Sequence, residues 1–205
     1  MSLRQNIVAQ FRRPHGTLGH LAGYIMANRP SNIERNEWTL ELLALEPGDR
    51  LLEVGFGPGI AIAQASRTIT RGLIAGIDHS EAMLHQARKR NSAAIRRGTV
   101  ELYRASVEAL PPFDEPFDKI YSVNVVQFWR EPVQVFEQLR SRLAVGGIIA
   151  TTYMPRHRGA TDSDAYAKAR EVVRQLEAAG FSSIRVEEKR MQPVSAMSVL
   201  AINTV

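Results

Sequence analysis

The chain has 205 residues, of which 44% are hydrophobic and 23% charged, and this length and composition predict one soluble globular domain with its own core. It contains no cysteine, which excludes disulfides, thiolate zinc sites and cysteine nucleophiles, and its five histidines are scattered, so we expect no metal site. The net charge is +5, yet the arginines are spread along the chain instead of forming one run, which argues against a nucleic-acid partner and leaves peripheral membrane contact open but unsupported.

Residues 1–46 are expected to form a mainly helical extension ahead of the first strand. Pro30 interrupts the helical pattern of this extension. Ser31 and Glu34 then have the S-x-x-E spacing of a capping box, which predicts a helix from Glu34 to Leu45. A Pro-Gly turn follows that helix and leads into the first strand.

The most informative stretch is the first strand, Arg50–Val54, together with the loop that follows it. Glycines alternate with other residues in this loop, and a helix over Ile60–Ser66 comes next; the glycines are Gly55, Gly57 and Gly59. Glycine lets a backbone adopt positive φ and approach a ligand closely, and the amino end of a helix suits an anionic group such as a carboxylate. A P-loop is excluded because no Gly-Lys-Ser/Thr follows, and the glycine spacing differs from the dinucleotide fingerprint G-x-G-x-x-G. The alternative is a tight strand–helix turn that binds nothing.

The second strand, Leu73–Asp78, is an apolar run that ends in a carboxylate. In doubly wound folds, an acid on the second strand, about 20 residues after the glycine loop, binds a ribose. Asp78 lies at a similar separation from Gly55. A carboxylate accepts two hydroxyl hydrogen bonds, which suits a cis-diol; the alternative is an acid that only caps a helix. Ser80 is the predicted N-cap of the next helix, which runs to Lys89. We expect Asp78→Ala to reduce ligand affinity strongly with little loss of stability.

Strands and helices alternate through the rest of the chain, which predicts an α/β fold with a parallel sheet and helices on both faces. A helix over Asp162–Ala179 precedes two final strands that are expected to pair antiparallel. The strands predicted after the first two are Val100–Tyr103, Phe117–Val123, Ile148–Tyr153, Ser183–Glu188 and Ala196–Ile202.

From about residue 35 onward, these motifs resemble those of the class I S-adenosylmethionine (SAM)-dependent methyltransferases. Glu53–Gly59 resembles their motif (D/E)-x-G-x-G-x-G, and Asp78–Ala87 resembles the pattern D-x-S-x-x-M-L-x-x-A. Glu108–Ile120 looks like the A-x-x-L-P…F-D-x-V segment, and Leu143–Gly147 looks like the L-x-P-G-G turn with valine in place of proline. The resemblance implies a three-layer, doubly wound, seven-stranded and mostly parallel sheet with a C-terminal antiparallel hairpin. It also implies SAM as cofactor, S-adenosylhomocysteine as product, and residues 47–205 as one SAM-binding domain.

By the same resemblance, the cofactor contacts fall at the ends of the first four strands: Glu53, Gly55, Phe56, Gly57, Gly59, Asp78, His79, Ser106, Val107 and Asn124. The sequence differs from the family pattern after the third strand. The family often has an acid there that accepts a hydrogen bond from the adenine amino group, whereas this chain has Ser106. Either the Ser106 hydroxyl accepts that bond as a weaker acceptor, or Glu108 takes the place of the acid.

Methyl transfer from a sulfonium is an in-line displacement, so the protein mainly aligns the reactants and a general base is weak or absent. The candidate catalytic residues follow the fourth and fifth strands, and they are Asn124, Tyr153 and His157. Asn124 would either line the site around the transferred methyl or only form a turn. His157 would either act as a base or only be a solvated side chain. Weaker candidates are Phe128, Trp129, His20 and Tyr24.

The segment Pro14–Gly23 is apolar and rich in glycine, and it resembles the mobile lid with which many small-molecule methyltransferases close over SAM and substrate. The alternative is an amphipathic helix that packs as ordinary structure. If the segment is a lid, removing residues 1–30 abolishes turnover and leaves a folded core.

These features predict an enzyme that transfers a methyl group from SAM to a small-molecule acceptor, either a lipid or a metabolite. The alternatives are an RNA or protein methyltransferase and, third, a non-catalytic SAM- or nucleotide-binding protein or an NAD-binding oxidoreductase. No stretch reaches the ~18 apolar residues that span a bilayer, and the first residues lack the features of a secretory signal, so we expect a cytoplasmic location.

Overall fold

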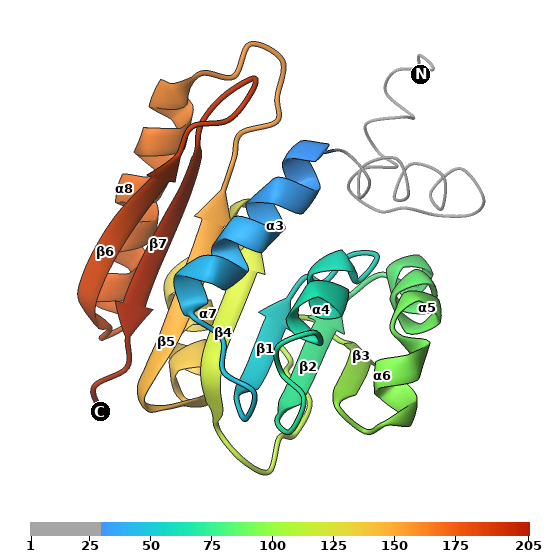
Figure 1. Ribbon diagram of the computed structural model, residues 1–205. Coiled ribbons are helices and arrows are strands. Elements are labelled where there is room, and N and C mark those ends of the chain that lie inside the picture. Colours follow the sequence, from blue (N-terminus) through green and yellow to red (C-terminus); the bar gives the residue numbers. More distant parts are fainter. Residues whose placement is uncertain (1–29) are drawn as a thin grey trace.

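The computed structural model describes residues 30–205, and these form one sheet of seven strands (Figure 1). The strand order is β3-β2-β1-β4-β5-β7-β6, in which β1 to β5 run parallel and β7 lies antiparallel to both β5 and β6. The strands are β1 (Arg50–Val54), β2 (Leu73–Asp78), β3 (Val100–Arg104), β4 (Phe117–Val123), β5 (Leu143–Tyr153), β6 (Ser182–Lys189) and β7 (Ala196–Ile202). The predicted mostly parallel sheet with a C-terminal antiparallel hairpin is confirmed.

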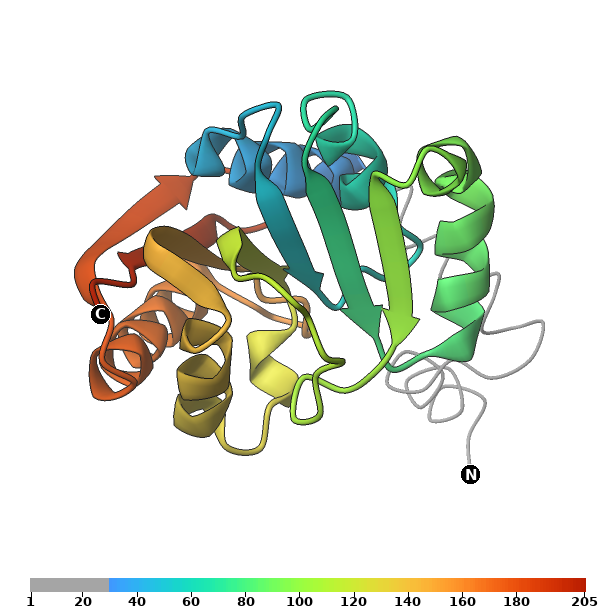
Figure 2. The same ribbon diagram turned by 90° about the horizontal axis from the view of Figure 1, so that it is seen from below.

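Helices cover both faces of the sheet, as Figure 2 shows with α3 and α4 on one side and α7 and α8 on the other. The helices are α3 (Pro30–Leu43), α4 (Ile60–Ala65), α5 (Glu81–Arg90), α6 (Ser92–Arg96), the short 3-10 helix η1 (Val126–Phe128), α7 (Pro132–Arg140) and α8 (Asp162–Ala178). Two large apolar cores and a small third cluster of Trp38, Met154, Met191, Val194 and Ala196 result among the described residues. One large core lies between the sheet and α7 with α8, and the other lies between the sheet and the helices α3 to α6. The molecule therefore has the three layers of a doubly wound fold.

The helix α3 begins at Pro30, four residues before the predicted start at Glu34, so the predicted capping box is wrong. Proline is tolerated in the first turn of a helix because the N–H it lacks would have no helical partner there. Ser31 therefore lies inside the helix, and its hydroxyl accepts a hydrogen bond from Arg156 instead of capping the helix. The helix ends at Leu43 because Ala44 adopts a left-handed φ of 48°.

The part of the predicted extension that the structure describes is packed onto the sheet. Trp38, Leu40 and Leu43 are buried, and the Thr39 hydroxyl lies 2.8 Å from the Thr152 hydroxyl of β5. The predicted lid segment, together with His20 and Tyr24, lies outside the described residues.

The strand β5 starts at Leu143, five residues earlier than predicted, and it contains the expected glycine turn as an irregularity. Leu143 pairs with Phe117 of β4, and the next pair joins Ile148 to Lys119, so extra residues bulge from β5 between these pairs. Gly146 in this bulge has a φ of 81°, a conformation that glycine adopts without strain.

Candidate active site

The carboxyl ends of β1, β2 and β4 meet at one edge of the sheet. In the sheet, β2 and β3 lie on one side of β1, whereas β4 and β5 lie on its other side. The direction of winding therefore reverses at this edge. Doubly wound sheets bind their ligands at such a switch point. The loops after β1, β2 and β4 carry most of the predicted site residues to it.

The three glycines of the loop after β1 adopt left-handed backbone conformations. The φ angles are 79° at Gly55, 52° at Gly57 and 74° at Gly59. A Cβ atom at Gly55 would lie 2.5 Å from Val125, and one at Gly59 would lie 2.7 Å from Ala87, so both glycines permit close packing. A Cβ atom at Gly57 would meet nothing within 4 Å. Gly57 therefore is the glycine that presents open backbone to a ligand.

The rear of the loop is held by the end of α5. Asn91 is buried, and its side-chain amide donates to the carbonyl of Gly59 at 3.0 Å and to that of Ala87 at 2.9 Å. Arg90 donates a short hydrogen bond to the carbonyl of Pro58. These bonds fix the loop on the side of α5, while no described residue packs against the position of a Cβ atom at Gly57.

Alanine at Gly57 is expected to weaken cofactor binding about tenfold or more, because its methyl group would project into the open side of the loop. The alanine variant would also be less stable by about 1–2 kcal/mol, because alanine is strained in the left-handed conformation. Gly98 provides the matched control, since it has a φ of 76°, its Cβ atom would also meet nothing within 4 Å, and it lies before β3 at the opposite edge. Calorimetric titration with S-adenosylhomocysteine and thermal unfolding of both variants test this. Equal affinities in the two variants would contradict the assignment.

Asp78 lies at the end of β2 and holds the glycine loop. Its carboxylate accepts the backbone N–H of Gly57 at 2.9 Å and that of Ser80 at 2.8 Å. Burial raises the pKa of Asp78, and the two N–H donors lower it in part. His79 lies beside the carboxylate with Nδ1 3.8 Å from Oδ1 and its ring largely exposed. A carboxylate has more than two acceptor positions, so Asp78 can still accept hydroxyl groups of a ligand.

Glu53 is a buried acid in the middle of this edge. It is 3% exposed and lies between its register partners Gly76 of β2 and Tyr121 of β4. Burial raises the pKa of Glu53 to about 8; the hydroxyl of Tyr121 acts in the opposite direction, and the charge of Asp78 adds to the increase. Among the described residues, neither the Oε2 atom of Glu53 nor the hydroxyl of the adjacent Tyr121 makes a hydrogen bond of ordinary geometry. Buried polar atoms without a partner are uncommon, so this pair of side chains needs an explanation.

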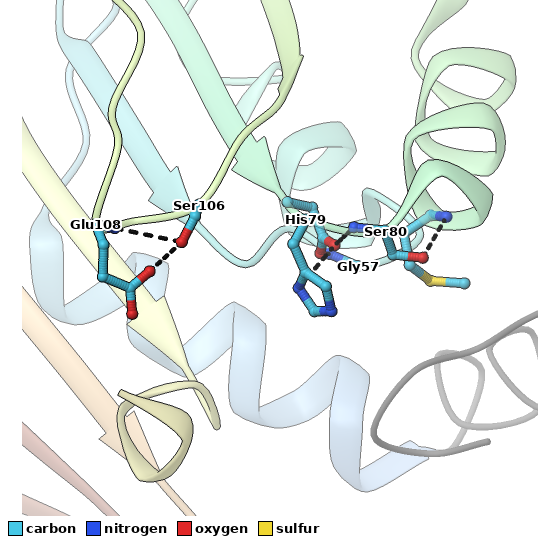
Figure 3. A network of polar contacts seen from close by, with 7 residues as sticks. Gly57, His79, Ser80, Ser106 and Glu108 are labelled. Atoms are coloured by element: carbon cyan, nitrogen blue, oxygen red, sulfur yellow. Dashed lines mark hydrogen bonds and ion pairs between the residues drawn. The ribbon is translucent and has the colours of Figure 1, made fainter. Parts of the chain in front are cut away.

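The loop after β3 brings Ser106 and Glu108 together at the same edge. The N–H of Ala105 donates to the carbonyl of Asp78 at 3.1 Å, which ties this loop to the end of β2. The Ser106 hydroxyl donates a short hydrogen bond to the Glu108 carboxylate, and both side chains are exposed (Figure 3). The two alternatives for the adenine partner, the Ser106 hydroxyl and the Glu108 carboxylate, are therefore neighbours.

Two predicted cofactor residues have their side chains in the core. Phe56 is 3% exposed and belongs to the core under α3 to α6, while Val107 is 7% exposed and belongs to the core under α7 and α8. Only their backbone groups could contact a cofactor.

Asn124 joins the ends of β4 and β5. Its φ is 55°, and its side chain pairs with the backbone of Met154: Nδ2 donates to the carbonyl at 3.0 Å, and Oδ1 accepts the N–H at 2.8 Å. Asparagine tolerates this left-handed conformation better than most residues. Both polar atoms of the amide are used in this pairing, so Asn124 shapes the edge by positioning the loop after β5.

The other two predicted catalytic residues lie toward α8. Burial raises the pKa of the Tyr153 hydroxyl, and the nearby acids Asp164 and Glu171 raise it further. His157 is exposed, and its Nε2 atom lies 3.7 Å from Asp164 near the start of α8. Neither residue contacts the glycine loop in the described structure.

The weaker aromatic candidates after β4 differ in exposure. Phe128 is 61% exposed, whereas Trp129 is 8% exposed and packs edge-on against Phe136 of α7, with ring centroids 5.1 Å apart. One residue near this edge was not predicted from the sequence. Arg35 of α3 contacts Met154, and nothing in a mixed polar and apolar helix marks one arginine as buried.

The fold and the edge residues define the class of protein, a Rossmann-like protein that binds an adenosine-containing cofactor. A family described as a methyltransferase domain matches residues 51–147. The chain is 35% identical over 173 residues to an uncharacterized methyltransferase, YdaC, of Bacillus subtilis, covering 84% of this chain and 92% of the relative. It is 31% identical over 128 residues to the trans-aconitate 2-methyltransferase of Variovorax paradoxus, covering 61% of this chain and 47% of that relative.

Among solved structures, the N-methyltransferase NodS of Bradyrhizobium japonicum in complex with S-adenosylhomocysteine has a TM-score of 0.71 at 14% identity, with 98% of both chains covered. The chain belongs to the class I SAM-dependent methyltransferase family and uses SAM as its cofactor. The residues present fit SAM, because Gly57 offers open backbone, Asp78 has free acceptor positions and Glu53 has an unpaired oxygen.

Within residues 30–205, none of the helices has the length and apolar character needed to cross a membrane. In the same part of the chain, no three side chains of the kinds that ligate metals are grouped as a metal site would require. The expectations of no metal and of a cytoplasmic location stay predictions.

Proposed function

We propose that this enzyme transfers the methyl group of SAM to a small-molecule acceptor, a metabolite or a lipid. The observation that carries the proposal is the construction of the edge at the ends of β4 and β5. Its polar side chains include the buried Arg35 and the half-buried Asn124, which lie beside the buried apolar residues Met154 and Val126. Sites for small ligands combine a small number of placed polar groups with apolar walls, whereas RNA-binding sites need a broad cationic surface.

The cofactor supplies a methyl group that its sulfonium already activates, so the residues of the chain chiefly bind, orient and exclude water. We assign Asp78 to the ribose hydroxyls, Glu53 to a cationic group of the cofactor, and the Ser106–Glu108 pair to the adenine. Asn124 acts as a positioning residue because it fixes the backbone of Met154. A Tyr153 hydroxyl with a raised pKa keeps its proton at neutral pH, so it would donate a hydrogen bond and not act as a base.

The proposal is tested by following a labelled methyl group. The protein is incubated with tritium-labelled SAM and a bacterial extract, which is then separated into small-molecule, lipid, protein and RNA fractions. We expect the label in the small-molecule or lipid fraction. Label that accumulates in RNA and depends on ionic strength would favour an RNA methyltransferase, and label in protein would favour a protein methyltransferase.

Deleting residues 1–29 tests the lid prediction while leaving α3 whole. We expect the truncated protein to unfold at the temperature of the full chain and to lose at least ~90% of its turnover, because an open site admits water and leaves the reactants unaligned. Thermal unfolding and the methyl-transfer assay measure the two effects. Turnover at the normal rate would show that these residues are no lid.

A further inference from the structure

Arg35 is a buried cation that has no acidic partner in the part of the chain that the structure describes. It is 3% exposed and lies on the face of α3 that packs on the sheet. Its guanidinium donates to neutral acceptors: the Asn32 side chain at 2.6 Å, the Ser31 carbonyl at 3.3 Å and the Met154 sulfur at 3.2 Å. Within residues 30–205, its Nε–H group has no hydrogen-bond partner. Charged groups buried in proteins are ordinarily paired, so this arginine needs an explanation.

The acids on α3 do not supply the missing charge. Glu34 lies 3.7 Å from Lys189, Glu37 accepts from the side chain of Gln64, and Glu41 is exposed. Among residues 30–205, no carboxylate lies within ion-pair distance of Arg35. Burial and the nearby charge of Arg156 lower the pKa of Arg35 to about 9, so the guanidinium stays charged at neutral pH.

A second arginine approaches the same place from the loop after β5. Arg156 is exposed, and its Nη2 donates to the Ser31 hydroxyl at 3.1 Å, while Arg35 donates to the carbonyl of that same serine. The two arginines therefore share Ser31 as an acceptor at the first turn of α3, and the charge of Arg156 acts on Arg35. An anion that bound beside Arg35 would be attracted by both charges. The exposed side of this pair is the side of Arg156.

The arginine pair adjoins the cofactor edge. Arg35 contacts the side chain of Met154, whose backbone is clamped by Asn124, and the next residue, Val125, packs against Gly55 of the glycine loop. Figure 1 shows the amino end of α3 extending past the arrowheads of β4 and β5. The site therefore lies on the β5 side of the cofactor residues, two strands from β1, which is a distance of ~10 Å at the usual strand spacing.

We propose that Arg35 and Arg156 bind a carboxylate or phosphate group of the methyl acceptor. This inference rests on the proposed function, because it names the chemical class of the acceptor at the same site. A guanidinium binds both kinds of anion with paired hydrogen bonds, and the unpartnered Nε–H of Arg35 is one such donor. An anionic acceptor is also attracted electrostatically to the positive sulfonium of the cofactor.

The test compares Arg35→Met with Arg185→Met, which removes the same charge at the other end of α3. Arg185 is exposed, and its Nη2 donates to the carbonyl of Leu42 at 3.3 Å. Each protein is saturated with S-adenosylhomocysteine and titrated calorimetrically with succinate, inorganic phosphate and neutral succinamide at constant ionic strength. We expect wild type and Arg185→Met to bind succinate or phosphate and not succinamide. We expect at least tenfold weaker anion binding in Arg35→Met and a smaller loss in Arg35→Lys.

A second titration distinguishes the acceptor from the cofactor as the source of the anion. Methylthioadenosine shares the adenosine part of S-adenosylhomocysteine and lacks its carboxylate. The proposal expects Arg35→Met to bind both compounds within about threefold of wild type. If Arg35→Met loses affinity for S-adenosylhomocysteine tenfold and keeps that for methylthioadenosine, Arg35 serves the cofactor and the proposal is overturned.

Other outcomes distinguish a failure of the proposed acceptor site from a failure of the proposed function. Anion binding that is absent from wild type, or unchanged in Arg35→Met, overturns the acceptor site while leaving the methyltransferase function in place. Label found in RNA or protein in the transfer assay overturns the small-molecule function whatever the anion titrations give. If Arg35→Met does not fold, Arg35→Lys and Arg156→Met are compared with Arg185→Met in the same way, and unchanged anion binding in both again overturns the proposal.

Discussion

Replacing Asp78 by alanine is expected to weaken S-adenosylhomocysteine binding by about 100-fold or more at pH 7. The carboxylate would otherwise accept hydrogen bonds from a ribose diol, and a bond to a charged group contributes about 1.5–3 kcal/mol. The same carboxylate holds the N–H of Gly57, so its loss also loosens the backbone that faces the cofactor.

The structure revises one part of this prediction. The sequence alone predicts little loss of stability, but Asp78 is the acceptor for two N–H groups, those of Gly57 and Ser80. We therefore expect Asp78→Ala to lose about 1–3 kcal/mol of folding free energy, because an unsatisfied buried donor costs that order and relief of carboxylate desolvation offsets part of it.

Asp118 supplies the control for Asp78. It is exposed, it accepts the N–H of Arg50 at 2.8 Å, and it lies near the opposite edge of the sheet. Asp118→Ala should leave the affinity within about twofold of wild type, as measured by the same calorimetric titration. If Asp78→Ala binds S-adenosylhomocysteine as tightly as Asp118→Ala does, the ribose is bound elsewhere.

The sequence predicts most of the fold because its strands are short apolar runs with clear ends. The bounds of β1, β2, β4 and β7 agree with the predicted ones, since each run is flanked by turn residues or by polar residues. The acid at the end of β2 and the alternating glycines after β1 are local signals, and the structure places them in contact through the Gly57–Asp78 hydrogen bond.

The parts that the sequence does not reveal depend on tertiary contacts. Pro30 can break a helix or begin one, and the packing of α3 on the sheet decides between these. Asn124 has the same sequence environment whether it faces a ligand or bonds Met154 across two loops. The burial of Arg35 follows from the position of α3 over the end of β5, which no periodicity in the helix indicates.

Replacing Glu53 by glutamine is expected to change the pH dependence of stability. Burial raises the pKa of Glu53 from 4.5 to about 8 in the folded protein. Between these two values the folded state holds a proton that the unfolded state releases, so wild-type stability falls as pH rises through this range. Glutamine carries no such proton. The glutamine variant should therefore gain stability relative to wild type from pH 5 to pH 8, by about 3–4 kcal/mol at ~1.4 kcal/mol per pH unit.

Urea unfolding of wild type and Glu53→Gln at pH 5, 6.5 and 8 measures this difference. Glu37→Gln controls for the loss of one negative charge, because Glu37 is exposed on α3. The stability of that control should follow wild type across the range. Parallel curves for wild type and Glu53→Gln would show that Glu53 ionises as it does in the unfolded chain.

The same proton links Glu53 to the cofactor. If the unpaired Oε2 atom faces a cationic group of SAM, binding stabilises the ionised carboxylate and releases a proton from the protein below pH 8. Calorimetry in buffers of different ionisation enthalpy should then detect up to about one proton released for each S-adenosylhomocysteine that wild type binds at pH 7. The Glu53→Gln variant lacks this carboxyl group, so its proton release should be smaller by that amount. Equal proton release in the two proteins would mean that Glu53 stays neutral in the complex, and its role would then be to hold the glycine loop through the sheet.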